Sequence, residues 1–220
     1  MKARLLKHTF RFKRPAGTSR GVMEERTSYF LILESPEQEG VFGIGECAPL
    51  PGLSKETEQD IEMLYHEFVQ GGMGKESFIK RLRNVSSLQF AMETALADVS
   101  NGGKQIIFPS DFTQGKTDLT INGLIWMGEP DFMKAQIKEK LEAGFKCLKL
   151  KIGALDFDTE LEILKDIRKE YDKDTLEIRV DANGAFDYET ALDKLGKLAA
   201  LHLHSIEQPI AAGHWSDMGK

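Results

Sequence analysis

Two lysines separated by a single residue could supply a base that abstracts a proton. Lys149 and Lys151 lie in the segment CLKLKIG, residues 147–153. In a strand, side chains alternate between faces, so both ammonium groups would lie on one face. Each positive charge disfavours the charged form of the other, so we expect the pKa of one lysine to fall towards the range of a general base. Because Lys-x-Lys pairs also occur on ordinary surfaces, the pair needs support from elsewhere in the chain.

Two carboxylates follow the lysines at the ends of later strand-like segments. Asp181 lies near the end of LEIRVDAN (176–183), and Glu207 lies near the end of HSIEQP (204–209). Carboxylates at the ends of successive strands can converge on a hard cation such as Mg²⁺, which prefers oxygen ligands. Taken singly, each acid could instead cap a helix or close a turn. The order of lysine pair, aspartate and glutamate, each at a strand end, is what favours a site.

The segments that would position these residues alternate between strand and helix. Four strand-like segments are separated by stretches with helical 3–4 periodicity, and this alternation predicts parallel βαβ units. The strand-like segments are 118–127, 147–153, 176–183 and 204–209.

The strands are expected to have one apolar and one charged face. Leu148 and Leu150 alternate with the two lysines, and Ile178 and Val180 alternate with charged residues in the next strand. Parallel sheets covered by helices are normally apolar on both faces. A charged face is therefore costly unless it is used, as it is at the carboxyl ends of the strands in a barrel enzyme. The alternative is a polar face that is simply solvated.

Residues 1–117 have a different pattern and predict a separate α+β unit. Strands are expected over 3–13, 27–34 and 41–46, and helices over 55–70 and 88–101. The turn-rich segment PAGTSRGV, residues 15–22, is expected to be a mobile loop. The predicted fold class is thus α/β: an α+β unit over 1–117, followed over 118–220 by about four strands of a (β/α) barrel.

Composition restricts the classes of function. The 220 residues are 41% hydrophobic and 29% charged, and the net charge of −6 comes from interspersed signs. A nucleic-acid partner would need a basic stripe, and a membrane span would need about 20 apolar residues. Neither occurs, so we expect no nucleic-acid or membrane partner and a cytoplasmic location. The two cysteines are expected to be free thiols.

The motifs KLK at 149–151, DAN at 181–183 and EQP at 207–209 resemble those of the enolase superfamily. The segment FAMETALADV at 90–99 is similar to a helix of its capping domain, and GIGECAPLPGLSKET at 43–57 is similar to its second specificity loop. Within that loop, PLPG-x-S-x-ET is similar to the subgroup of o-succinylbenzoate synthases.

The resemblance implies a capping domain on a modified, TIM-like barrel and a reaction that begins with proton abstraction next to a carboxylate. Mg²⁺, with Mn²⁺ as an alternative ion, would stabilise the enediolate, a strategy for which the enolase superfamily is itself the standard example. In the synthase subgroup, the cyclohexadiene carboxylate SHCHC loses water to give o-succinylbenzoate, a menaquinone precursor. The implied partner is thus a small-molecule carboxylate.

By motif, Lys151 would be the general base and then the acid that assists hydroxide departure. Lys149 would tune Lys151 and orient the substrate carboxylate. Asp181 and Glu207 would be metal ligands. Asn183 would either support the groups that bind the metal or contact the substrate. The resemblance also implies that loops 15–22 and 48–54 close over the succinyl group. The side chains expected to contact it are Ser19, Arg20, Pro51 and Leu53.

The pattern of the superfamily also calls for residues that are not found. A third carboxylate ligand and a lysine across the barrel would both lie beyond Lys220. We expect a partial barrel with open sheet edges, which could self-associate.

Several other functions remain open from the sequence. A dipeptide epimerase, an N-acylamino-acid racemase or a muconate cycloisomerase would share the same lysine and carboxylates. An inactive fragment is a further alternative. A Schiff-base aldolase also uses a barrel lysine, but the acids at the strand ends favour metal-assisted enolisation.

Overall fold

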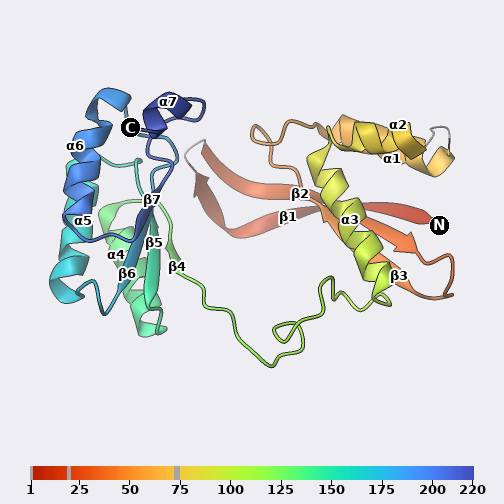
Figure 1. The fold of residues 1–220 in the computed structure, drawn as a ribbon, viewed down its shortest axis with the longest axis horizontal. Coiled ribbons are helices and arrows are strands. Elements are labelled where there is room, and N and C mark those ends of the chain that lie inside the picture. Colours follow the sequence, from red (N-terminus) through yellow and green to blue (C-terminus); the bar gives the residue numbers. More distant parts are fainter. Residues whose placement is uncertain (1, 19–20, 72–74) are drawn as a thin grey trace. The chain divides into compact units, whose positions relative to one another are not determined.

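The computed structural model describes residues 2–18, 21–71 and 75–220 and divides the chain into two compact units (Figure 1). The first unit comprises Met1–Pro15 and Met23–Asp118. The second comprises Leu119–Lys220 together with Ala16–Val22.

The first unit consists of a three-stranded sheet and three helices. The sheet has the order β1-β2-β3, and β2 pairs with β3 in antiparallel register from Tyr29 opposite Cys47 to Glu34 opposite Phe42. Its elements are β1 (Ala3–Thr18), β2 (Gly21–Glu34), β3 (Phe42–Cys47), α1 (Glu58–Gln70), α2 (Lys75–Leu82) and α3 (Ser86–Ser100). The periodicity of the sequence predicts α1 and α3 but misses the short helix α2.

The prediction of a mobile loop over 15–22 is wrong for the residues that the structure describes. Pro15–Thr18 continue β1, and Gly21 and Val22 begin β2. Pro15 has no N–H to donate, which usually argues against a strand. It is tolerated here because β1 is an edge strand of the sheet.

The Gly-Ile-Gly segment of β3 permits a close approach to α3. A Cβ on Gly45 would lie 1.8 Å from the carbonyl oxygen of Ala91, and a Cβ on Gly43 would lie 2.0 Å from that of Ala95. No other residue type would fit without moving the helix. The glycines therefore serve helix–sheet packing over a core that includes Leu31, Leu33, Leu64 and Leu88.

The second unit is a parallel sheet with the order β4-β5-β6-β7. The predicted βαβ alternation is confirmed, although the first strand is shorter than the segment 118–127 suggested. The elements are β4 (Gly123–Ile125), α4 (Pro130–Glu142), β5 (Cys147–Lys151), α5 (Phe157–Glu170), β6 (Glu177–Asp181), α6 (Tyr188–Ala199), β7 (Ser205–Glu207) and α7 (Trp215–Met218).

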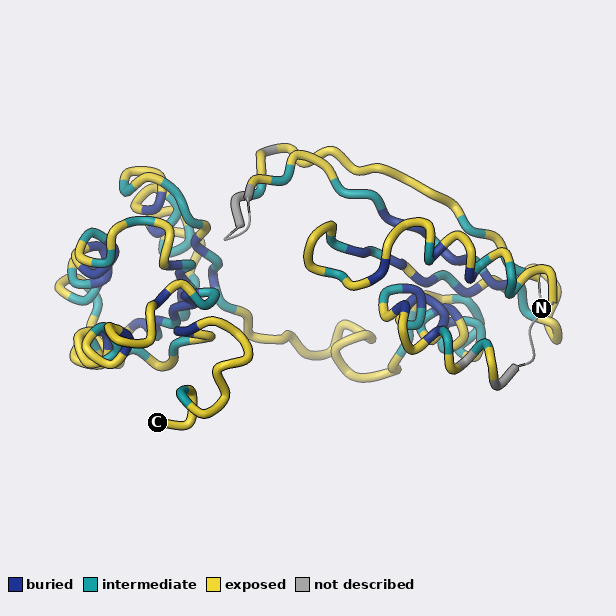
Figure 2. Tube along the Cα trace, turned by 90° about the horizontal axis from the view of Figure 1, so that it is seen from above, coloured by how far each residue is buried: buried dark blue, intermediate teal, exposed yellow. Residues whose placement is uncertain are grey.

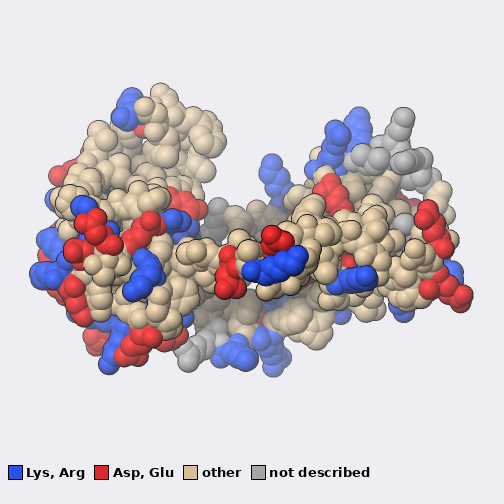
Figure 3. All heavy atoms as spheres, turned by 60° about the horizontal axis from the view of Figure 1, so that its bottom comes forward, with Lys and Arg blue, Asp and Glu red and all other residues tan. Residues whose placement is uncertain are grey.

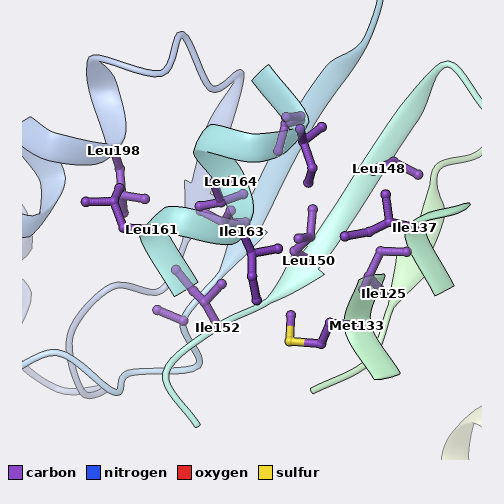
Figure 4. Packing of buried hydrophobic residues seen from close by; sticks show 14 of the residues in the cluster. Ile125, Met133, Ile137, Leu148, Leu150, Ile152, Leu161, Ile163, Leu164 and Leu198 are labelled. Atoms are coloured by element: carbon purple, nitrogen blue, oxygen red, sulfur yellow. The ribbon is translucent and has the colours of Figure 1, made fainter. Parts of the chain in front are cut away.

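One face of this sheet is apolar and is covered by helices. Leu148, Leu150, Ile178 and Val180 are each at most 1% exposed, and they join a core with side chains from α4, α5 and α6. Figure 4 shows Leu164 and Ile163 of α5 beside Leu150 of the sheet. The alternating residues Lys149, Lys151 and Arg179 lie on the other face and are only partly buried.

Burial follows the strands and the inner sides of the helices, as Figure 2 shows. Residues 108–121, between the last helix of the first unit and β4, are exposed without a break. On the face drawn in Figure 3, basic and acidic side chains are interleaved, in keeping with the mixed signs of the sequence.

Candidate active site

The parallel register brings the predicted lysine and carboxylates to one edge of the sheet. Lys151 of β5 lies opposite Asp181 of β6, and Asp181 lies opposite Glu207 of β7. All three are the last residues of their strands. Since parallel strands end at the same edge, residues 30 positions apart (151 to 181) and 26 positions apart (181 to 207) in sequence become neighbours.

Both lysines contact the central carboxylate. Lys151 Nζ donates to Asp181 Oδ2 at 2.7 Å and to Asn183 Oδ1 at 3.0 Å. Lys149 Nζ lies 3.4 Å from Asp181 Oδ2 and also donates to Glu207 Oε2. The structure therefore brings together five of the predicted residues: Lys149, Lys151, Asp181, Asn183 and Glu207.

Asn183 has a backbone conformation suited to its position. Its φ is 48°, in the left-handed region that asparagine enters more readily than most residues. Its N–H donates to Asp181 Oδ1 at 3.0 Å, which closes a turn through the aspartate side chain. This turn leaves Asp181 Oδ2 to the lysines and directs the Asn183 amide oxygen towards Lys151.

The carboxylates dominate the electrostatics of the site. The Glu207 carboxylate accepts a hydrogen bond from Lys149 and raises the pKa of that lysine, with a further contribution from Asp181. These carboxylates outweigh the burial that disfavours the charged form of Lys149, so Lys149 is not the member of the lysine pair whose pKa falls. Burial disfavours the charged form of Asp181, but Lys151 and the Asn183 N–H outweigh burial and lower its pKa.

The site is partly open. The side chain of Asp181 is 1% exposed, those of the two lysines are 24% exposed, and that of Glu207 is 62% exposed. A half-buried amine beside a buried carboxylate and a more exposed one could move a proton at a carbon next to a carboxylate group. The arrangement of these side chains is thus able to support enolisation.

The donor set of the site consists of hard oxygen atoms, the type that Mg²⁺ prefers. Asp181 and Glu207 supply carboxylates from adjacent strands in register. Among the described residues, the structure contains no cluster of three or more His, Cys, Asp or Glu side chains that could hold a metal ion. Mg²⁺ is commonly held by one or two carboxylates with water and substrate oxygens, so the residues present fit this ion.

The role of the predicted loop residues stays a prediction. Pro51 and Leu53 belong to the first unit and are exposed in the turn after β3. Ser19 and Arg20 lie outside the described residues.

Solved structures of known enzymes share this fold. The crystal structure of MenC from Desulfotalea psychrophila LSv54 superposes with a TM-score of 0.76 and 35% sequence identity, and it matches 99% of this chain and 67% of that one. The chain belongs to the enolase superfamily. Residues 132–220 match the family described as Enolase C-terminal domain-like, which agrees with the superfamily's barrel domain. The predicted fold class, a capping domain followed by part of a barrel, is confirmed.

Individual relatives within the enolase superfamily include o-succinylbenzoate synthases. The synthase of Desulfotalea psychrophila is 41% identical over 94% of this chain and 64% of its own length, so the chain spans somewhat less than two thirds of that relative. The structure of the synthase from Thermosynechococcus elongatus BP-1, which contains magnesium in its active site, has a TM-score of 0.77 at 23% identity. It matches 99% of this chain and 64% of that one.

Among the described residues, no helix has the length and apolar character needed to cross a membrane.

The motifs alone miss one buried acid beside the site. Glu160 of α5 is 2% exposed and binds backbone N–H groups of the segment that follows Lys151. A signal for it exists in the sequence. Glu160 lies three, four and seven positions before Ile163, Leu164 and Ile167, so it occupies the apolar stripe of an amphipathic helix where an acid is unexpected.

Proposed function

We propose that this chain carries the base-bearing part of an o-succinylbenzoate synthase, which removes water from SHCHC to give the menaquinone precursor o-succinylbenzoate. The observation that carries the proposal is the aligned set of Lys151, Asp181 and Glu207 at the carboxyl ends of three adjacent strands. The 41% identity with a synthase of this activity favours it over other members of the superfamily.

In this proposal Lys151 handles the proton at both steps. Its neutral amine would take the proton from the carbon next to the substrate carboxylate. The C–O bond to the leaving hydroxide would then break, and the same ammonium group would return the proton to give water. A single lysine acting in both steps requires that proton and hydroxide leave from the same face of the ring.

Lys149 would provide a fixed positive charge. Its pKa is raised by Glu207, so it stays protonated and could attract the substrate carboxylate. Asn183 would hold the Lys151 amine in place through the 3.0 Å contact between Lys151 Nζ and Asn183 Oδ1. Lys149 and Asn183 would thus orient the reacting groups without exchanging a proton.

Asp181 and Glu207 would hold Mg²⁺, with Mn²⁺ as an alternative ion. When bound, the metal supplies positive charge that stabilises the enediolate oxygen atoms. The magnesium in the active site of the Thermosynechococcus synthase supports this assignment. Ser19, Arg20, Pro51 and Leu53 would contact the succinyl side of the substrate.

The test is Mg²⁺-dependent loss of SHCHC catalysed by the chain, with Lys151→Ala and the matched control Lys146→Ala. Lys146 is an exposed lysine directly before β5. We expect turnover in the wild type and the control, and a loss of at least about a thousandfold in Lys151→Ala, since a base and an acid are removed together. Full activity in Lys151→Ala would overturn the proposal. Epimerisation of dipeptides without turnover of SHCHC would also overturn it and would identify the chain as part of a dipeptide epimerase.

A further inference from the structure

A buried carboxylate, to which the described residues offer no basic partner, lies one turn into α5. The Glu160 side chain is 2% exposed, and within the described part of the chain its hydrogen-bond partners are all backbone N–H groups. Burial raises the pKa of Glu160, and the N–H groups only partly oppose that effect. Burying a carboxylate costs free energy, so the buried position of Glu160 indicates a specific role.

The Glu160 carboxylate holds three consecutive residues of one turn. The N–H of Gly153 lies 2.8 Å from both carboxylate oxygens. Those of Ala154 and Leu155 lie 3.2 Å and 3.1 Å from Oε1. Successive N–H groups that converge in this way form a cradle for an anion. Here the anion comes from the helix that follows the turn, so one side chain sets the path of the backbone over 153–155.

This turn is the direct continuation of the strand that carries Lys151. β5 ends at Lys151, and the next N–H, that of Ile152, donates to the Asp181 carbonyl oxygen at 2.9 Å. Gly153 then turns the chain with a φ of 96°, at a point where a Cβ would lie 2.4 Å from the Cβ of Ala185. The backbone that leaves Lys151 is therefore held from two sides, by β6 and by Glu160.

We propose that Glu160 is a positioning residue for Lys151. By holding the turn over 153–155, it sets the exit of β5 and thereby directs the Lys151 amine towards Asp181 and Asn183. The catalytic consequence rests on the proposed function, in which Lys151 moves the proton. The positioning itself does not depend on any reaction.

A purely structural role for Glu160 predicts a different outcome. If the carboxylate only stabilises the fold, its loss opens the unit as a whole and exposes Lys149 and Lys151 together. If it positions Lys151, its loss changes Lys151 more than Lys149, which lies two residues further from the turn. The ratio of the reactivities of the two lysines therefore separates the two roles.

The experiment is limited acetylation of the folded chain with acetic anhydride, with the rates at Lys149 and Lys151 read from fragment ions in mass spectrometry. Glu160→Gln keeps the size of the side chain but replaces one acceptor oxygen by an NH₂ group that cannot accept. Glu162→Gln makes the same change on the same helix, at a side chain that is 61% exposed. We expect the Lys151-to-Lys149 rate ratio to rise about fivefold in Glu160→Gln, because a neutral acceptor holds the N–H groups of the turn less strongly than a charged one, and to stay unchanged in Glu162→Gln.

An unchanged ratio in Glu160→Gln, or an equal rise at both lysines, would overturn the proposal. Glu160→Asp, which keeps the charge but shortens the reach, provides the same comparison where glutamine prevents folding. Because acetylation needs no turnover, a failed synthase assay leaves this result intact. Where turnover is present, we expect kcat to fall about tenfold in Glu160→Gln with little change in KM, since a displaced base affects the chemical step.

Discussion

At the scale of single residues, the two lysines of β5 share a strand face but have different surroundings. Lys151 is bound by Asp181 and Asn183, whereas Lys149 reaches across to Glu207. The raised pKa of Lys149 makes it a permanent cation beside the proposed base. The lysine pair is therefore better described as one proton carrier and one fixed charge than as two interchangeable amines.

The conformation of Asn183 leads to a prediction at this scale. Its positive φ costs a residue with a Cβ roughly 1–2 kcal/mol, a cost that asparagine partly offsets with local hydrogen bonds. We expect Asn183→Ala to be about 1 kcal/mol less stable than Asn183→Gly, because both lose the contact with Lys151 but only alanine is strained. Urea unfolding followed by the fluorescence of Trp126 and Trp215, both in the second unit, measures this difference. Equal stabilities of the two variants would contradict the strain argument.

At the scale of elements, helix α3 is capped by a residue from the segment between β3 and α1. Its N-cap, Val85, has no side chain that can accept a hydrogen bond. Glu56 replaces it, since its Oε1 accepts from Ser87 N at 2.8 Å and from Ser86 Oγ at 3.2 Å. A single carboxylate thus ties the end of the 43–57 segment to the start of a core helix.

This cap predicts a pH-dependent stability. Burial opposes ionisation of Glu56, but the bonds from Ser87 and Ser86 outweigh it and lower the pKa below the ordinary 4.5. The stabilisation is therefore present above pH 4.5 and is lost as the pH falls through the lowered pKa. We expect Glu56→Gln to be about 1 kcal/mol less stable than the wild type at pH 7 and to approach it in acid.

Urea unfolding followed by far-ultraviolet circular dichroism at several pH values tests the cap. Glu39→Gln, at an exposed acid in the turn before β3, is the matched control and should not change the unfolding free energy. A gap between wild type and Glu56→Gln that does not narrow in acid would show that the charge of Glu56 has no part in the cap.

At the scale of the whole molecule, the chain contains two hydrophobic cores with no residue in common. One lies between the antiparallel sheet and α1–α3, and the other between the parallel sheet and α4–α6. In the described chain the parallel sheet has two edge strands, β4 and β7. Self-association through these edges stays a prediction.

The separate cores predict that packing defects act on one unit at a time. Leu164 of α5 is fully buried in the second core, and Leu64 of α1 is 1% exposed in the first. We expect Leu164→Ala to lower the unfolding free energy of the second unit by about 2–5 kcal/mol. Leu64→Ala should leave the tryptophan-detected transition of that unit unchanged, because Trp126 and Trp215 both belong to it. An equal shift of this transition in both variants would contradict the independence of the cores.

The sequence by itself determined the elements of the second unit and the residues of its site. Alternation of apolar and charged residues is a local property, so the faces of β5 and β6 could be assigned from Leu148, Lys149 and their neighbours. The motif order also placed Lys151, Asp181 and Glu207 at strand ends. Periodicity failed where a helix was too short to repeat its pattern, as in the eight residues of α2, or where Pro15 suggested a break that an edge strand can tolerate.

Only the tertiary structure decided which groups touch. The register of parallel strands sets Lys151 opposite Asp181 and Asp181 opposite Glu207. It thereby allows Glu207 to accept a hydrogen bond from Lys149 and to raise the pKa of that lysine. The periodicity of α5 places Glu160 on its apolar stripe, but the turn after β5 to which Glu160 is bound was likewise not specified by local patterns. The physical reason is that hydrogen bonds and desolvation depend on distances between segments far apart in the chain, which spacing along the sequence does not specify.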